Sequence, residues 1–297
     1  MNVYIQSLLL GIVEGLTEFL PVSSTAHLRI AEAAMRIPLD DAYWIMYTIV
    51  IQAGAILALI LLYLGRIVAF VKSFPRGESG DRTWTNHPIS LTLIAFFFTS
   101  IIALPLHKIS EKHLGSISVM AWTLLIGGIV MWVIDARSSR YEPTTLHVEE
   151  MSLGQSIWIG ICQSLSAIFP GTSRSMSTIA AGQLVGMDRP SALEFSFLLS
   201  IPTMLAATAW DLLKSVHPSK SALASGAMPV AQVTMNSQRW MVLIIGFVVS
   251  FVVALGVVEW FLAWVRKHGF TIFAVYRIII GILLLVLGSR LFAAGSS

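Results

Sequence analysis

Long uncharged stretches dominate the pattern of hydrophobic and polar positions along the chain. No Lys, Arg, Asp or Glu occurs in residues 42–64, 88–106, 114–134 or 240–258. Each stretch is close to the roughly 20 residues that a helix needs to cross the hydrocarbon core of a bilayer. Unbroken apolar runs of this length indicate helices rather than barrel strands. We therefore predict an all-α polytopic membrane protein with about six transmembrane helices.

The composition agrees with a membrane protein. Hydrophobic residues make up 56% of the 297 positions and charged residues only 12%, against about 25% in soluble domains. The longest polar stretches, residues 66–87, 135–150 and 214–239, are interpreted as connectors, so the chain is predicted to be a single integral membrane domain, residues 1–297. The net charge of +3 is not gathered into a basic block, and no nucleic-acid partner is expected.

Two proline-containing segments interrupt this pattern and resemble each other. Residues 11–27 and 160–175 align with an offset of 149 residues, which places Ser24 opposite Ser173. In each segment a proline ends one short helix, and the Ser and Thr residues that follow are suited to cap the next one. We expect each segment to form a re-entrant helical hairpin. A pair of ordinary kinked spanning helices is the alternative.

The offset is about half the chain, which predicts an inverted repeat with one copy in about residues 1–135 and the other in about residues 150–297. Paired broken helices in corresponding halves point to a binding site near the interface of the repeats. The same architecture is used by transporters. A lipid-phosphate or anion transporter or flippase is therefore the alternative to an enzyme.

Two carboxylates lie in the first broken segment. Glu14 and Glu18 are four residues apart and share one helix face. Acidic groups in an apolar segment are costly and usually functional. A divalent cation would relieve their mutual repulsion, and oxygen ligands suit Mg²⁺ or Ca²⁺, so the pair is a candidate metal site. The alternative is a helix end at which both acids reach water.

Candidates for nucleophilic chemistry and anion binding accompany the acids. Ser24 and His27 are three residues apart on the next short helix and form a nucleophile–base pair in principle. In the second segment, backbone N–H groups at a helix start and a guanidinium would bind an anion. The expected phosphate cradle consists of Gly171, Thr172, Ser173, Arg174, Ser175 and Thr178.

The alternative for the second segment is a capped helix whose Arg174 extends to the membrane interface. Taken together, an acidic pair, a nucleophile with a base, and an anion cradle form the set that phosphoryl transfer needs. Two further charges, Glu194 and Arg277, lie in or near apolar stretches and are candidates for a structural ion pair.

Both segments resemble the signatures of a known family, the bacitracin-resistance type undecaprenyl-diphosphatases. The resemblance rests on residues 14–27 (EGLTEFLPVSSTAH) and 170–175 (PGTSRS) with Thr178, and residues 194–199 and the pair Tyr276-Arg277 also fit. It covers essentially the whole chain. The resemblance implies a multi-pass hydrolase of the bacterial plasma (inner) membrane that removes the terminal phosphate of undecaprenyl diphosphate. That reaction recycles the lipid carrier for peptidoglycan synthesis and confers bacitracin resistance.

The resemblance also implies metal-assisted hydrolysis. Glu14 and Glu18 would bind Mg²⁺ or Ca²⁺ or its water, and Arg174 would bind the diphosphate. Ser24 with His27 as its base is the preferred nucleophile, and water activated by His27 or Glu18 is the alternative. The implied partners are a polyprenyl diphosphate lipid and membrane lipid, and a homodimer is left open.

Three places depart from the family pattern. Ala26 stands where the family usually has glycine, Met176-Ser177 where it usually has Gly-Ala, and Arg29 where an apolar residue is expected. The first two changes add bulk where helices pack closely. We expect them to affect the geometry of the pocket and the catalytic rate more than the type of reaction.

Overall fold

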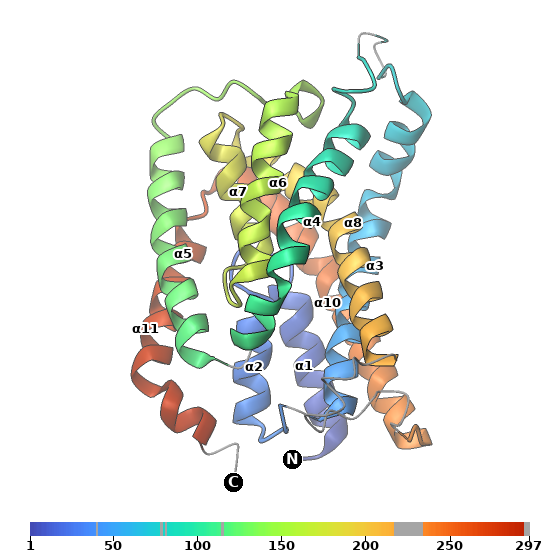
Figure 1. Ribbon diagram of the computed structural model, residues 1–297, viewed down its shortest axis with the longest axis vertical. Coiled ribbons are helices and arrows are strands. Elements are labelled where there is room, and N and C mark those ends of the chain that lie inside the picture. Colours follow the sequence, from blue (N-terminus) through green and yellow to red (C-terminus); the bar gives the residue numbers. More distant parts are fainter. Residues whose placement is uncertain (40, 78–79, 81, 114–115, 217–233, 294–297) are drawn as a thin grey trace.

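The computed structural model describes residues 1–39, 41–77, 80, 82–113, 116–216 and 234–293. Its regular elements are helices gathered into one bundle (Figure 1). Within these ranges there is no β-strand, and Thr145 and Met187 form an isolated β-bridge. Six helices are long and apolar enough to cross a membrane. The prediction of an all-α polytopic membrane protein is thereby confirmed.

Each half of the described chain consists of two short α-helices followed by three long ones. The six candidate spans are the long helices. Most of the polar stretch at residues 214–239 lies outside the described residues. In chain order the elements are α1 (Val3–Thr17), α2 (Ser24–Ala34), α3 (Ala42–Ser73), α4 (Pro88–His113), α5 (Ile117–Ser138), the short helix η1 (Val148–Glu150), α6 (Leu153–Ile168), α7 (Arg174–Leu184), α8 (Arg189–Val216), α10 (Ser237–Lys267) and α11 (Thr271–Ala293).

The two halves pack against each other through equivalent helices. The first helix of one half, α1, packs along α10 of the other, and the corresponding helices α6 and α4 pack along each other. The last helices of the halves, α5 and α11, also form an extensive contact. Because this packing pattern is unchanged when the halves are exchanged, each half completes the core of the other.

The short helices form two hairpins that point toward each other. In Figure 1 the α1–α2 hairpin comes from the end of the molecule where both termini lie, and the α6–α7 hairpin comes from the opposite end. The break between α1 and α2 touches the break between α6 and α7 about halfway along the molecule. The re-entrant course of the hairpins through a bilayer stays a prediction.

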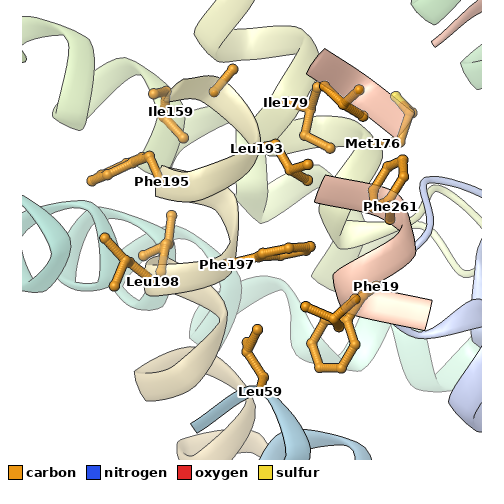
Figure 2. Close-up of a cluster of buried hydrophobic side chains, with 14 of the residues drawn as sticks. Phe19, Leu59, Ile159, Met176, Ile179, Leu193, Phe195, Phe197, Leu198 and Phe261 are labelled. Atoms are coloured by element: carbon orange, nitrogen blue, oxygen red, sulfur yellow. The ribbon is translucent and has the colours of Figure 1, made fainter. Parts of the chain in front are cut away.

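A buried apolar cluster holds the first break in place. Phe19, between α1 and α2, packs edge-on against Phe197 of α8, with the ring centroids 5.6 Å apart. Figure 2 shows both rings in one cluster with Leu59 and Phe261. Broken backbone at membrane depth must lie inside protein, because lipid offers its N–H and C=O groups no partners. The cluster provides that enclosure.

Candidate active site

The end of α1 carries two buried carboxylates. Glu14 is 1% exposed and Glu18, the C-cap residue, is 8% exposed, so the alternative in which both acids reach water is wrong. Glu18 accepts a hydrogen bond from the Ser24 hydroxyl at 2.5 Å, and its other oxygen lies 3.8 Å from the Arg174 guanidinium. Both carboxylate oxygens of Glu14 are buried without a hydrogen-bond partner among the described residues.

The first turn of α2 corrects the expected pairing of Ser24 with His27. The Nδ1 atom of His27 lies 2.7 Å from the carbonyl oxygen of Ser23, and Nε2 lies 2.7 Å from the hydroxyl of Tyr276. Since a carbonyl oxygen only accepts, Nδ1 carries the proton and Nε2 accepts from the tyrosine. Ser24, as the first residue of α2, instead points its hydroxyl back to the end of α1. The base within its reach is Glu18.

The second break turns sharply into α7. Gly171 and Ser173 adopt positive φ angles of 91° and 72°, and the Ser173 hydroxyl caps the helix by accepting from the N–H of Met176. A Cβ atom on Gly171 would collide with Thr123 of α5, so only glycine fits here. The remaining N–H groups of the first turn lack intrahelical acceptors and can bind an anion.

Arg174, the first residue of α7, is mostly enclosed and only partly paired. Its side chain is 12% exposed, Nη1 donates to the carbonyl oxygen of Ser196 at 3.3 Å, and Nη2 lies 3.8 Å from Glu18. Nε and Nη2 are buried and have no hydrogen-bond acceptor in the described part of the chain. These two groups form one edge of the guanidinium, and such an edge binds two oxygens of a phosphate. The alternative in which Arg174 extends to the membrane interface is therefore wrong.

The two broken segments are in contact, as a binding site at the interface of the repeats requires. Ser175 donates to the carbonyl oxygen of Leu20 at 3.0 Å, and Arg174 approaches Glu18. The helices also correct the alignment, because α2 begins at Ser24 and α7 begins at Arg174, an offset of 174 − 24 = 150 residues. A hydroxyl and a guanidinium thus approach Glu18 from equivalent positions of two opposed helices.

Other predicted cradle residues are hydrogen-bonded within the protein. The Thr178 hydroxyl is buried and lies 2.6 Å from the hydroxyl of Ser196. Ser196 in turn accepts a hydrogen bond from Arg174 through its carbonyl oxygen, so Thr178 supports the position of Ser196. The Thr172 hydroxyl donates to the carbonyl oxygen of Phe169 at 2.8 Å. Within the predicted set, Arg174 and the start of α7 therefore offer the principal donors to an anion.

Arg277 of α11 has a role that the sequence analysis did not predict. Its side chain is fully buried and donates to four backbone carbonyls at 3.0–3.3 Å. One carbonyl belongs to the first break, two to the second break and one to α5, so this guanidinium ties the breaks together. The acceptors are Pro21, Gly171, Thr172 and Thr123.

The predicted ion pair between Glu194 and Arg277 is wrong. Glu194 lies 2.8 Å from Arg66 of α3, which also reaches Glu149 at 2.7 Å. Arg277 binds carbonyls because broken helices expose carbonyl oxygens that lack intrahelical donors. The signal that pointed to it was the pair Tyr276-Arg277 in an otherwise apolar stretch.

Arg277→Lys is expected to lower the thermal unfolding midpoint in detergent by several degrees. A single ammonium cannot span carbonyls in two breaks, and each buried polar group left unpaired costs about 1–3 kcal/mol. Arg137→Lys, at an exposed position near the end of α5, is the matched control and should melt like the unmodified protein. Equal midpoints for the two variants would show that Arg277 does not hold the breaks together.

The departures from the family pattern are accommodated locally. Met176 is 5% exposed and packs over Gly127 of α5. A Cβ atom at position 127 would lie only 2.8 Å from the terminal methyl group of Met176. Arg29 is paired with Glu32 at 3.3 Å. Ala26 is 1% exposed in a small apolar cluster between α2, α5 and α11. The side chain of Met176 therefore packs against a glycine, Ala26 is enclosed by apolar side chains, and the added charge of Arg29 has a partner.

The donor set fits a hard cation. The described residues contain no group of three or more His, Cys, Asp and Glu side chains that would hold a metal by themselves. Glu14 and Glu18 provide four carboxylate oxygens, and the two of Glu14 are buried without donors. A buried charge without a partner is costly. Mg²⁺ and Ca²⁺ bind such oxygens and complete their coordination with water or phosphate oxygens.

Fold and site together define a class of protein. It is a multi-pass helical membrane protein in which two opposed hairpins bring buried carboxylates, a hydroxyl and a half-paired guanidinium to one point. This arrangement suits recognition of a phosphate group that belongs to a lipid.

Comparison with known proteins identifies the family. Residues 7–283 match the family described as bacitracin resistance protein BacA, and the chain belongs to it. A relative from Koribacter versatilis, named undecaprenyl-diphosphatase, is 56% identical over 286 residues, which is 96% of this chain and 98% of the relative. A relative of the same name from Caldanaerobacter subterraneus is 39% identical and covers 97% of this chain and 97% of its own length. Another from Rhizobium etli is 40% identical and covers 95% of this chain and 96% of its own length.

Proposed function

We propose that this protein hydrolyses undecaprenyl diphosphate to undecaprenyl phosphate and inorganic phosphate in the bacterial inner membrane. The observation that carries the proposal is the half-paired guanidinium of Arg174 beside the hydrogen-bonded pair of Ser24 and Glu18. Membership of the family and the shared name of its relatives support the same reaction. The product is the lipid carrier of peptidoglycan synthesis, and its regeneration gives bacitracin resistance.

Ser24 supplies the nucleophile. Its hydroxyl donates to Glu18 at 2.5 Å, so Glu18 takes the proton as the Ser24 oxygen attacks the terminal phosphorus. The bond from that phosphorus to the bridging oxygen breaks, and undecaprenyl phosphate leaves. Water then attacks the phosphorus of the phosphoserine, inorganic phosphate leaves, and Glu18 returns the proton to the Ser24 oxygen. Arg174 neutralises charge on the phosphoryl oxygens through Nε and Nη2.

Glu14 and Glu18 are the residues that would hold a divalent cation, Mg²⁺ or Ca²⁺. When bound, such an ion supplies charge neutralisation for the diphosphate. The support for this site is the pair of buried Glu14 oxygens without donors. Glu18 then has two tasks, because it also accepts the proton of Ser24.

Exhaustive chelation is expected to lower phosphate release by about 100-fold, and Mg²⁺ or Ca²⁺ should restore it. Glu14→Gln removes one negative charge from the proposed site, so the cation concentration for half-maximal activity should rise about tenfold. Glu142→Gln, at an exposed position, is the matched control with an unchanged cation requirement. Full turnover after chelation would rule out the metal and leave the acids as bases or hydrogen-bond partners.

Phosphate release by the purified protein in detergent separates a hydrolase from a flippase. A micelle does not have two separated leaflets, so a translocation reaction gives no product in this assay, whereas a hydrolase gives one phosphate for each lipid. We expect inorganic phosphate and undecaprenyl phosphate in equal amounts. Intact diphosphate lipid in the presence of either cation would refute the hydrolase, and translocation between vesicle leaflets would then be measured.

A further inference from the structure

A groove of about 430 Å³ runs between α5, α6 and α7. Its volume is within the range of about 300–1,000 Å³ that is usual for small-molecule sites. Both α5 and α6 pack on α7, which lies between them in Figure 1 and forms the floor. The walls are apolar side chains, among them Ile126 of α5, Leu165 of α6 and Ala181 of α7.

One end of the groove adjoins the second break. It begins at Thr172, in the second break, and at Thr123, whose hydroxyl donates to the carbonyl oxygen of Pro170 at 2.7 Å. It continues past Met176, two residues after Arg174, and ends at Leu184, the last residue of α7. A ligand can therefore occupy the groove while its head group binds at the start of α7.

The direction of the groove matches the direction of a lipid substrate. The carboxylates and Ser24 belong to the hairpin that comes from the end of the molecule with both termini, whereas α7 extends toward the opposite end (Figure 1). A molecule with its diphosphate between the hairpins and its apolar chain along α7 would thus be extended along the bundle. A free phosphate or another soluble anion would leave the groove unused.

We propose that this groove holds the isoprenoid units next to the diphosphate of the lipid substrate. The assignment rests on the proposed function and extends it, because it names the residues that bind the chain. The remaining isoprenoid units lie in the surrounding lipid. Since an apolar groove gains little from burial when lipid surrounds it, its effect is to orient the terminal phosphorus toward Ser24.

Cys162 provides a native probe of occupancy. It is the only cysteine of the chain and it lines the groove on α6. We expect undecaprenyl phosphate to slow the modification of Cys162 by N-ethylmaleimide about tenfold, measured by mass spectrometry, because the chain covers the thiol. Inorganic diphosphate should not slow it. Unchanged labelling with undecaprenyl phosphate, or equal protection by inorganic diphosphate or by phosphatidylglycerol, would overturn the assignment.

Two isoleucines of α5 form a matched pair for a kinetic test. Ile126 lines the groove and is 54% exposed, whereas Ile129 does not line it and is 45% exposed. Ile126→Trp should lower kcat/KM for undecaprenyl diphosphate about tenfold, equivalent to about 1.4 kcal/mol, and should leave the slower hydrolysis of inorganic diphosphate, which has no isoprenoid unit, unchanged. Ile129→Trp should change neither.

The outcomes separate the groove from the reaction. If the unmodified protein releases no phosphate, the proposed function fails, and the labelling of Cys162 still reports whether the lipid occupies the groove. If the unmodified protein is active but Ile126→Trp and Ile129→Trp behave alike and Cys162 is not protected, only the groove assignment fails. A tenfold loss confined to the long-chain substrate in Ile126→Trp, together with protection of Cys162, supports it.

Discussion

Arg174→Lys is expected to lower kcat/KM for phosphate release by about 100-fold although the positive charge is kept. The reason is the edge formed by Nε and Nη2, two buried donors without acceptors in the described protein. A lysine ammonium is a point charge and cannot bind two phosphate oxygens in parallel. The measurement is steady-state phosphate release from undecaprenyl diphosphate in detergent, with the fold checked by thermal melting.

Arg66→Lys is the control for this change. Arg66 is also paired with carboxylates, but at the sites of Glu149 and Glu194, and lysine can keep those ion pairs. We expect its activity to stay within about twofold of the unmodified protein. Near-normal kcat/KM in a well-folded Arg174→Lys variant would remove Arg174 from the phosphate site.

Ser24→Ala is expected to lower kcat by about 1,000-fold or more, because it removes the attacking oxygen. The residual rate would come from binding and charge neutralisation. Glu18→Gln should cause a loss of similar size, since Gln cannot take the proton of Ser24 as a carboxylate does. His27→Ala should cost much less, because His27 is hydrogen-bonded to Ser23 and Tyr276 and is not the partner of the Ser24 hydroxyl.

Thr25→Ala is the matched control for the loss of a hydroxyl. Thr25 adjoins Ser24 and is exposed, so its activity should be normal. Rapid quenching with substrate labelled in the terminal phosphate should yield a phosphoserine at position 24. If Ser24→Ala retains more than about a tenth of the activity, water activated by Glu18 or His27 is the nucleophile instead.

Local features of the sequence were sufficient for the elements and for the candidate residues. A run of about 20 apolar residues specifies a spanning helix without reference to its neighbours, and the long runs do become helices. Pro170 ends α6 through its missing N–H group, directly after the C-cap residue Phe169, whereas α1 ends at Thr17, four residues before Pro21. The repeat was visible for the same reason, but its register at the starts of α2 and α7 was off by one residue, because a short motif does not reveal at which residue a helix begins.

Side-chain partners depended on the tertiary structure. The spacing of three residues predicted a hydrogen bond between Ser24 and His27. The turn between α1 and α2 instead points the Ser24 hydroxyl toward Glu18. From charge, Arg277 belonged with Glu194, yet the interlocked halves place it among four carbonyls and place Arg66 beside Glu194. The partner of Ser24 is decided by the conformation of the turn between α1 and α2, and the partners of Arg277 and Glu194 by the packing of distant helices.

The sequence by itself therefore determined that this is a multi-pass helical membrane protein, and which short segments carry acids, hydroxyls and a guanidinium. Helix formation and helix termination are governed by neighbouring residues, so they can be predicted from a linear pattern. Only the tertiary structure decided that two opposed hairpins meet, that Glu18 lies between Ser24 and Arg174, and that a groove runs along α7 from the second break. The contacts between the hairpins join residues about 150 positions apart, and they arise because each half buries its broken backbone against the other.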